Sequence, residues 1–370
     1  MKKVLVLGAS GSIGKNTIEI IRAFPDHFSL AGFTVGKNLA AAEALKKEFP
    51  EAACFIASEQ KLETELYPFI VRCNADIAVN GISGAIGLRA SICCIEAKLD
   101  LALANKESIV MAGGLLKDFA RRNGVKLIPV DSEHSAVFCL INAFEKTNVD
   151  KIILTASGGP FRKMPAADLQ NVTVADALNH PTWKMGGKIS IDSATLANKA
   201  LEVIEAVNLF DLPAENVLVS VHPESIIHSM ILLNSGEVYA QASPPDMRFP
   251  ILQALEFPQP APPYLKPLDF SQSCSLHFEP PRFDDFPLLK MGFDVAKLGA
   301  SYPIAFNAAN EVAVEKFLSG SIGFLDIARV VGKVLTHDWH DVPSDFAQVF
   351  DVDANARHLA ASHILGIAKN

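Results

Sequence analysis

Short apolar runs alternate with helix-like segments from residue 1 to residue 131. Near-continuous apolar strands separated by helices are typical of a parallel sheet that is buried on both faces. Because crossovers between parallel strands are right-handed, we expect a doubly wound, Rossmann-type domain over residues 1–131. The apolar runs are VLVLG (4–8), FSLAGFTVG (28–36), CFIAS (54–58), DIAVN (76–80), DLALAN (100–105) and VKLIPVD (125–131).

The pattern changes after residue 131. KIILTAS (151–157) is a strand-like run that leads into a glycine pair, and residues 193–210 have the spacing of one helix. VLVSVHPESIIHSMILL and EVYAQAS predict further strands. We therefore expect a central α+β domain over residues 132–257.

A proline-rich stretch and a helical tail follow. FPQPAPPYLKP (257–267) contains five prolines, which exclude a central strand or a helix interior, so we expect a connecting segment over 258–284. From residue 285 the periodicity is helical, and Asp353 is placed to cap a last helix that begins at Ala354. The predicted fold class is α/β, with an N-terminal Rossmann-type domain, a central α+β domain and a C-terminal helical domain over 285–370.

Composition and charge narrow the function classes. The chain is 49% hydrophobic and 20% charged, which is typical of a globular protein with a sizeable core. A net charge of −8 argues against binding nucleic acid, although a local field can still favour a small anionic substrate. No two of the six cysteines form a C-x-x-C pair, and no apolar run has the length of a membrane span or a signal peptide. We expect reduced thiols, no membrane segment and a cytoplasmic location.

Three glycines follow the first predicted strand. Gly8, Gly11 and Gly14 form G-x-x-G-x-x-G between a strand and a helix, where glycines permit a tight turn and the helix N-terminus offers N–H groups to a pyrophosphate. The first spacing is one residue longer than in the usual dinucleotide fingerprint. A strand–helix turn without a ligand therefore remains an alternative.

The end of the second strand bears on the choice of dinucleotide. NAD-binding domains usually place an acid there for the ribose 2′-hydroxyl, but residues 28–42 contain none. Gly36, Lys37 and Asn38 follow the strand, and a cation beside an amide suits a 2′-phosphate. NADPH is favoured over NADH, with an ordinary solvated Lys37 as the alternative.

Two acids follow the sixth predicted strand. If the segment is extended, Asp131 and Glu133 point to the same face, at the carboxyl edge of the sheet where α/β folds bind ligands. A divalent cation would relieve the repulsion between them. A solvated strand end and an Asp-Ser helix cap ahead of Ser135 remain open alternatives.

A second segment offers further candidates. On a helix, Asn198, Lys199 and Glu202 share one side, while Leu196, Leu201 and Ile204 can cover the buried side. These polar residues form either an ordinary surface ion pair or a set of phosphate donors beside a metal-binding carboxylate. Oxygen ligands without cysteine or histidine would select Mg²⁺ or Mn²⁺.

A glycine pair follows large side chains in HPTWKMGGKIS (180–190). His180, Trp183 and Met185 precede Gly186, and mobile glycines beside apolar side chains suit a lid that excludes water. Taken alone, such a Trp or Met is more often a core residue.

A series of short motifs extends over nearly the whole chain: GASGSIG, GKN, LANKES, PVDSEH, SGGPF, HPTWKMG, KISIDSATLANKALE, HPESIIHS, PPDMR and NAANE. In these motifs the sequence resembles the 1-deoxy-D-xylulose-5-phosphate reductoisomerase family. It departs from the family pattern at Glu224, where Gln is more frequent, and at Ala200, where Gly is common. Neither position matches a ligand of the family.

The resemblance implies roles for individual residues. The acids Asp131, Glu133 and Glu202 correspond to the ligands of Mg²⁺ or Mn²⁺. Phosphate and hydroxyl contacts correspond to Ser157, Ser193, Asn198 and Lys199, with His180 closing from a lid that includes Trp183 and Met185. Lys106 and Ser132 match contacts to the substrate backbone. NADPH contacts match Ser10, Gly11, Ser12, Ile13, Gly36, Lys37, Asn38, Asn105, Glu107 and Gly186.

The resemblance also implies an activity: isomerisation of 1-deoxy-D-xylulose 5-phosphate, a small phosphorylated sugar, followed by reduction with NADPH. The product is 2-C-methyl-D-erythritol 4-phosphate, on the methylerythritol phosphate route to isoprenoids, and the expected assembly is a homodimer. Two other classes are weighed beside it. A semialdehyde-type dehydrogenase needs a nucleophilic cysteine, for which Cys139 is the candidate, and a redox sensor has no reason to carry three acids and a phosphate-type donor set.

Overall fold

The computed structural model describes residues 1–183 and 185–367, and of Glu59 only the backbone. The described chain forms two compact units, which we describe separately. Unit 1 contains Met1–Ser108, Leu116–Phe138 and Asp246–Pro267. Unit 2 contains Ile109–Leu115, Cys139–Pro245 and the described residues from Leu268 onward. The domain boundaries expected from the sequence stay a prediction, and the part of the predicted 285–370 domain beyond residue 367 lies outside the described residues.

Unit 1 is built on a parallel sheet with the strand order β3-β2-β1-β4-β5-β6. This is the doubly wound order of dinucleotide-binding domains, which confirms the predicted Rossmann-type fold. All six predicted strands are present. They are β1 (Lys2–Leu7), β2 (Phe28–Val35), β3 (Ala53–Ile56), β4 (Ile77–Asn80), β5 (Asp100–Leu103) and β6 (Leu127–Pro129).

Helices connect these strands, and each begins after a strand or a turn that the sequence places there. Seven helices begin within unit 1 before residue 139. They are α1 (Ser12–Ala23), α2 (Leu39–Glu48), α3 (Glu59–Thr64), α4 (Leu66–Cys73), α5 (Gly87–Glu96), α6 (Lys106–Asn123) and α7 (Ser132–Phe144).

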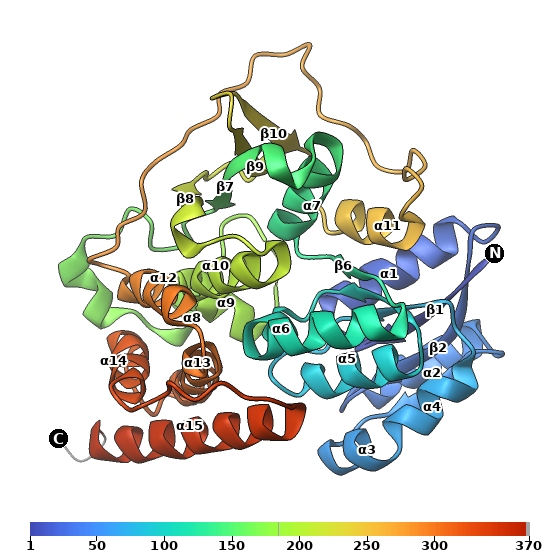
Figure 1. Ribbon diagram of the computed structural model, residues 1–370, viewed down its shortest axis with the longest axis horizontal. Helices are drawn as coiled ribbons and strands as arrows, with labels where there is room; N and C mark the ends of the chain where they lie inside the picture. The colour runs from blue at the N-terminus through green and yellow to red at the C-terminus, as the bar shows by residue number, and fades with distance from the viewer. Residues whose placement is uncertain (184, 368–370) are drawn as a thin grey trace. The chain divides into compact units, whose positions relative to one another are not determined.

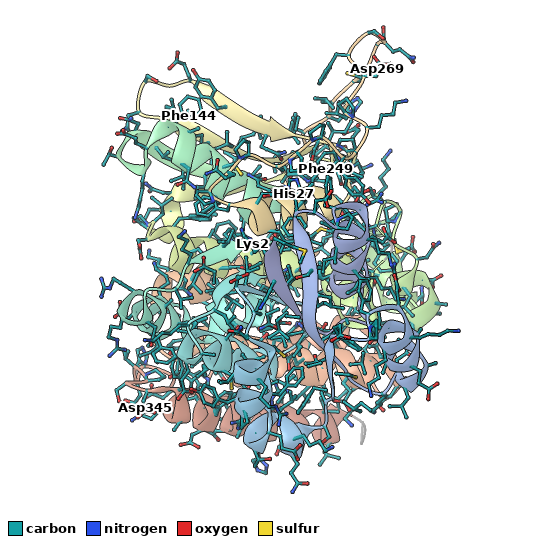
Figure 2. The ribbon with its side chains drawn as sticks, turned by 90° about the vertical axis from the view of Figure 1, so that its right-hand side faces the viewer. Lys2, His27, Phe144, Phe249, Asp269 and Asp345 are labelled. Carbon is teal, nitrogen blue, oxygen red and sulfur yellow. The ribbon has the colours of Figure 1, made fainter. Side chains whose placement is uncertain are left out.

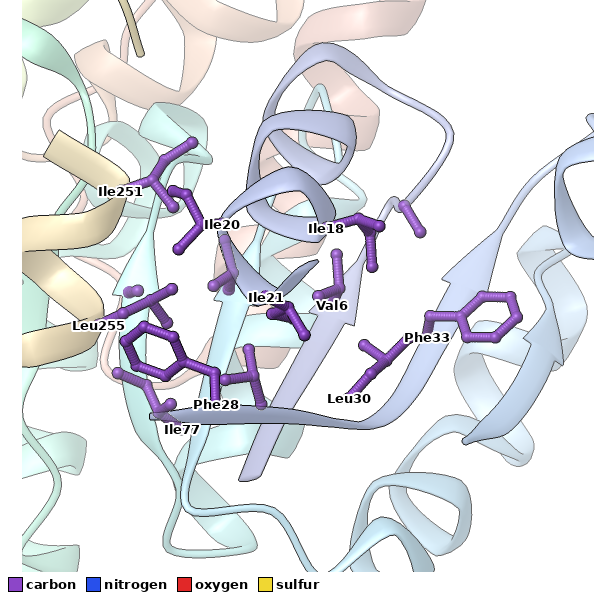
Figure 3. Packing of buried hydrophobic residues seen from close by; sticks show 14 of the residues in the cluster. Val6, Ile18, Ile20, Ile21, Phe28, Leu30, Phe33, Ile77, Ile251 and Leu255 are labelled. Atoms are coloured by element: carbon purple, nitrogen blue, oxygen red, sulfur yellow. The ribbon is translucent and has the colours of Figure 1, made fainter. Parts of the chain in front are cut away.

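A helix from late in the sequence completes the core of unit 1. Helix α11 (Arg248–Glu256) places Ile251 and Leu255 beside Ile20 and Phe28, and all four side chains are buried (Figure 3). Two polar residues at the first and second strands, both labelled in Figure 2, bond the end of this helix. Lys2 donates to the carbonyl of Leu255, and His27 Nδ1 lies 2.7 Å from Glu256 Oε1.

The last residues of four strands, β1, β4, β5 and β6, pair with one another across the sheet. Leu7 pairs with Asn80, Asn80 with Leu103, and Leu103 with Pro129. Because all these strands are parallel, the segments that follow them emerge at the same edge of the sheet. The glycine turn, the start of α6 and the start of α7 therefore share that edge.

Unit 2 contains a mixed sheet with the strand order β10-β9-β7-β8. Strands β7 and β8 are parallel, whereas β9 is antiparallel to both β7 and β10. The strands predicted after residue 150 are confirmed. They are β7 (Val149–Ala156), β8 (Val217–Val221), β9 (Ile227–Leu233) and β10 (Val238–Ala242).

The C-terminal part of unit 2, from α12 onward, is mostly helical, which confirms the predicted helical C-terminal part. Helix α10 packs against α12, and α13 packs against both α14 and α15 (Figure 1). The proline-rich stretch at 257–267 contains no helix or strand. Within the described residues, no helix is long and apolar enough to cross a membrane. The helices are α8 (Val174–Leu178), α9 (Gly187–Ala194), α10 (Ala197–Phe210), α12 (Pro287–Leu298), α13 (Tyr302–Leu318), α14 (Phe324–Leu335) and α15 (Phe346–Ile367).

Two details of the sequence prediction are wrong. Residues 193–210 form the end of α9 and the whole of α10, because Leu196 between them has a left-handed backbone with φ of 59°. Asp353 does not cap the last helix but lies inside α15, where Arg357 bonds it at 2.6 Å across one turn. Asp345 caps the helix instead, since its Oδ1 accepts from the Gln348 N–H at 2.9 Å.

Candidate active site

The glycine turn of unit 1 has the geometry of a dinucleotide-binding loop. Gly8 has a φ of +83°, which favours glycine, and a Cβ on Gly14 would lie 2.4 Å from the Gly8 carbonyl oxygen. Gly11 is the N-cap residue of α1 and has no side chain to cap it, so the helix N-terminus is left to a ligand or solvent. Of the predicted contacts, Gly11 and Ser12 are exposed and Ser10 and Ile13 half-buried. Close helix–strand packing with an open, uncapped N-terminus fits a pyrophosphate.

The segment after β2 is open to solvent. Gly36, Lys37 and Asn38 are all exposed. Asn38 caps α2, because its Oδ1 accepts from the Ala41 N–H at 3.0 Å. Lys37 stands beside this cap with no acidic residue between 28 and 42, so the residues present fit a 2′-phosphate better than a 2′-hydroxyl.

Asn105 is held by its own neighbours at the end of β5. Its Oδ1 caps α6 by accepting from the Ser108 N–H at 3.0 Å. Its Nδ2 lies 2.7 Å from Glu107 Oε2, and 2.8 and 3.0 Å from the carbonyls of Ile82 and Gly84. The side chains of Asn105 and Glu107 are therefore tied to the loop after β4, where doubly wound sheets bind their ligands.

A buried chain of hydrogen bonds supports this arrangement. Asn80 Nδ2 donates to Ser91 Oγ at 2.8 Å, and Ser91 Oγ lies 2.9 Å from Ser108 Oγ. Ser108 Oγ donates in turn to Asn105 Oδ1. The sequence analysis does not predict this buried hydrogen-bond chain. The one indication of it in the sequence is Asn80, a polar residue at the end of the apolar DIAVN strand.

Lys106 and Asp131 form a nearly buried ion pair at the same sheet edge. Lys106 Nζ lies 2.9 Å from Asp131 Oδ2, and their side chains are 8% and 12% exposed. His134, which is fully buried, places Nδ1 3.2 Å from Asp131 Oδ1. Burial would raise the pKa of Asp131, but the Lys106 ammonium and His134 hold that pKa well below its usual range. Asp131 is therefore a carboxylate, as a metal ligand must be.

Glu133 lies beside Asp131, as expected, but it belongs to a helix and not to the predicted strand. It belongs to the first turn of α7, not to an extended strand, so the argument from alternating side chains is wrong. Its N–H donates to Asp131 Oδ1 at 3.2 Å, and Ser132 Oγ donates to its Oε2 at 2.5 Å. The helix-capping alternative is correct as to local structure. It also keeps both carboxylates at one helix N-terminus, so it leaves the cation hypothesis open.

In unit 2, the side chains predicted to share one face of a helix do so. Asn198 Nδ2 and Lys199 Nζ each donate to the carboxylate of Glu202, which is 0% exposed. Lys199 is also buried, so the surface ion pair considered above is excluded. Asn198 Oδ1 is buried and accepts no hydrogen bond within the described residues. The Asn198 Oδ1 atom, beside the charged Lys199 and Glu202, is therefore suited to accept from a ligand hydroxyl or to bind a cation.

The other phosphate-type candidates lie beside the α9–α10 turn. A Cβ on Gly159, where φ is +69°, would lie 2.7 Å from the carbonyl oxygen of Ser193. The backbone after Ser157 therefore lies against Ser193. His180 Nε2 is 3.1 Å from Ser157 Oγ. Unit 2 thus places Ser157 in contact with His180, and Gly159 against Ser193, which lies four residues before the start of the helix that carries Asn198 and Lys199.

The segment between α8 and α9 carries the predicted lid residues. Trp183 is half-buried, with its ring centroid 6.4 Å from that of His228, and Met185 is also half-buried. Gly186 is exposed and is the N-cap residue that precedes α9. Lys184 of the HPTWKMG motif lies outside the described residues.

The two departures from the family pattern have local explanations. Glu224 Oε1 lies 2.6 Å from His277 Nδ1, which ties the end of β8 to the connecting segment. Burial would raise the pKa of Glu224, but its bonds with His277 hold that pKa below its usual value. Ala200 packs on Gly292 of α12, where an added Cβ would lie 2.4 Å from the Ala200 Cβ.

The fold and these residues define a Rossmann-type, dinucleotide-binding protein. Three family models match the chain: 1-deoxy-D-xylulose 5-phosphate reductoisomerase over residues 4–113, and two models of its C-terminal domain over residues 127–210 and 242–359. The chain belongs to the 1-deoxy-D-xylulose 5-phosphate reductoisomerase family. This membership confirms the resemblance and decides against the dehydrogenase and redox-sensor alternatives.

Individual relatives cover nearly the whole chain. The 1-deoxy-D-xylulose 5-phosphate reductoisomerases of Treponema denticola and Treponema pallidum are 55% and 51% identical to it. Each alignment covers 98% of this chain, with 97% and 98% of the relative. The Zymomonas mobilis enzyme, solved with NADPH, is 38% identical with a TM-score of 0.89 over 98% of this chain and 99% of that one. A reductoisomerase solved with NADPH, fosmidomycin and magnesium is 34% identical, also with a TM-score of 0.89, over 98% of both chains.

Proposed function

We propose that this protein isomerises 1-deoxy-D-xylulose 5-phosphate and reduces the product with NADPH, giving 2-C-methyl-D-erythritol 4-phosphate in the methylerythritol phosphate pathway. One observation supports this most strongly. A Rossmann-type glycine turn and a cluster of the half-buried Asn198 with the buried Lys199 and Glu202 occur in one chain that belongs to the reductoisomerase family. Cofactor binding and phosphate recognition are two of the requirements of this reaction.

A divalent cation, Mg²⁺ or Mn²⁺, is proposed to bind Asp131, Glu133 and Glu202. All three ligands are carboxylates, which suit a hard cation. When bound, the cation supplies Lewis acidity toward the substrate oxygens, and NADPH supplies the hydride. Lys106 and Lys199 each bond one of these acids, so the three negative charges are partly offset before a cation binds.

Other residues are proposed to orient the substrate. Ser157, Ser193, Asn198 and Lys199 hold its phosphate and neighbouring hydroxyls, and His180 donates to the same group from the lid. Trp183 and Met185 cover the substrate and exclude water. Lys106 and Ser132 contact its backbone, where the Lys106 ammonium, oriented by Asp131 at 2.9 Å, stabilises negative charge on a substrate oxygen.

The cofactor is proposed to lie along the edge of the unit 1 sheet. Its contacts there and at the start of α9 are Ser10, Gly11, Ser12, Ile13, Gly36, Lys37, Asn38, Asn105, Glu107 and Gly186. The protein is further proposed to act as a homodimer. A cytoplasmic location is proposed as well, in keeping with six cysteines that form no disulfide in the described part of the chain.

The test follows NADPH absorbance with 1-deoxy-D-xylulose 5-phosphate, with and without Mn²⁺. Metal-dependent oxidation is expected, and its absence would overturn the proposal. Glu202→Gln keeps the shape of the side chain but removes its charge. It should lower turnover at least about 100-fold, or ~2.7 kcal/mol, while NADPH still binds. Loss of NADPH binding in this variant would contradict the assignment of Glu202 to the metal.

A further inference from the structure

A buried hydrogen bond joins α13 to α9 in unit 2. Asn310 Nδ2 donates to Asp192 Oδ1 at 2.7 Å, and the two residues are 0% and 1% exposed. Lys188 Nζ lies 3.0 Å from the other carboxylate oxygen of Asp192. Asn310 belongs to the NAANE motif, to which the proposed function assigns no role. A buried carboxylate requires such partners, since an unpaired one is strongly unfavourable.

Asp192 immediately precedes the turn that carries the proposed phosphate ligands. Ser193 follows it, and Thr195 Oγ1 donates to the carbonyls of Ile191 and Asp192 at 3.0 and 3.2 Å. Leu196 then has its left-handed backbone, and α10 begins at Ala197. The position of Ser193 relative to Asn198 and Lys199 therefore depends on how the end of α9 is held.

The turn is also constrained from its other side. Gly159 lies so close to Ser193 that an added Cβ would stand 2.7 Å from the Ser193 carbonyl oxygen. Ser193 is thus held between the segment after Ser157 and the Asp192–Asn310 bond. A shift of α9 on α13 would move Ser193 away from the position that Ser157 defines.

We propose that Asn310 is a positioning residue for phosphate recognition, acting through Asp192 on Ser193. The proposal rests on the proposed function, because it takes the phosphate of the substrate as the ligand of Ser193. Asn310 and Lys188 also contact the two carboxylate oxygens of Asp192, which stabilises its negative charge one residue before Ser193. The loss of Asn310 weakens the phosphate end of the site and leaves the cofactor end unchanged.

Asn307 provides a matched control on the same helix. It lies one turn before Asn310 and is also 0% exposed. Its Nδ2 donates to Glu311 Oε1 at 3.3 Å, and Glu311 bonds Arg357 of α15. Asn307→Ala therefore removes the same group from the same buried helix, but the bond that it breaks leads through Glu311 to Arg357 and not to Asp192.

The experiment compares Asn310→Ala with Asn307→Ala in the full-length protein. For Asn310→Ala we expect KM for 1-deoxy-D-xylulose 5-phosphate to rise about tenfold, the effect of losing a hydrogen bond to a charged group. KM for NADPH should stay within about twofold, and Asn307→Ala should leave both constants unchanged on that scale. Equal KM values in the two variants, or a parallel rise in KM for NADPH, would overturn the proposal.

A rescue variant and a binding measurement complete the test. Asn310→Asp places two carboxylates together and should raise KM further, and adding Asp192→Asn restores an amide–carboxylate bond and should recover part of the loss. No recovery would count against positioning through this bond. Inorganic phosphate titrated calorimetrically should bind more weakly to Asn310→Ala than to Asn307→Ala. This comparison still decides the inference if the wild-type protein fails to oxidise NADPH with the sugar phosphate, a result that would overturn only the proposed reaction.

Discussion

The sheet edge of unit 1 and the α9–α10 turn of unit 2 hold their candidate side chains by different means. At the sheet edge, parallel strands in register deliver Lys106 and Asp131 to neighbouring positions directly after β5 and β6. At the turn, Ser193 is positioned by residues from distant parts of the chain, Gly159 and, through Asp192, Asn310. Regular secondary structure positions the first set, whereas buried polar contacts between helices and loops position the second.

The largest expected effect comes from breaking the buried pair of unit 2. Lys199→Ala removes the buried cation beside Glu202, which is 0% exposed. Removing one partner of a buried pair typically costs about 3–5 kcal/mol. The free energy of unfolding from urea titration should fall by that order, and NADPH oxidation should be lost.

An exposed pair on the same unit is the control for Lys199→Ala. Lys290 and Asp294 are also one turn apart, on α12, but their side chains are 67% and 58% exposed. Lys290→Ala should leave the urea midpoint unchanged within error. If both lysine variants behave alike, burial does not distinguish the α10 pair from a surface pair.

At the sheet edge of unit 1, we expect the largest loss of NADPH binding from a substitution at Gly14. A Cβ there would lie 2.4 Å from the Gly8 carbonyl oxygen and from Ala9 Cα, which are both backbone atoms. Overpacking of this kind costs about 1–3 kcal/mol. Gly14→Ala should therefore raise the Kd of NADPH at least about tenfold, or ~1.4 kcal/mol, as measured by fluorescence titration. Gly114→Ala, where an added Cβ meets nothing within 4 Å, should leave NADPH binding intact.

The sequence predicts the two regions to different extents. The strands of unit 1, the glycine turn and the one-sided Asn198–Lys199–Glu202 set follow from periodicity and spacing, and the structure contains them. The sequence does not predict the division between α9 and α10, because a left-handed leucine has no signature in composition. Asn310 lies 118 positions from Asp192, and no local pattern indicates which helix a buried asparagine faces. Local rules predict the ligands better than they predict the contacts that hold those ligands.

A smaller effect is expected within the buried chain of unit 1. Ser108→Ala removes the hydroxyl that joins Ser91 to the cap residue Asn105 but leaves the Ser108 N–H on Asn105 Oδ1. The expected loss is about 1 kcal/mol of unfolding free energy, the usual net value of one hydrogen bond. Urea titration measures it, and NADPH oxidation should fall by less than about fivefold. A loss as large as that of Lys199→Ala would mean that the sheet edge depends on buried polar contacts as strongly as the α9–α10 turn does.

The smallest expected effect is the pH response of His180 beside that turn. Its Nδ1 accepts from the N–H groups of Thr182 and Trp183 at 3.2 and 2.9 Å, so Nε2 carries the proton and donates to Ser157 Oγ. Burial lowers the pKa of His180 below the usual value of about 6.5. As the pH falls below about 6.5, the unfolded chain takes up a proton before the folded one does, so this contribution to stability declines and is lost below the folded-state pKa.

An NMR titration of the His180 ring should give a midpoint below 6.5. His180→Asn, whose side-chain oxygen can accept the same N–H groups, should abolish this part of the pH dependence of unfolding. A midpoint above 6.5 would mean that the imidazolium is favoured, and that Nδ1 does not hold the lid turn as an acceptor.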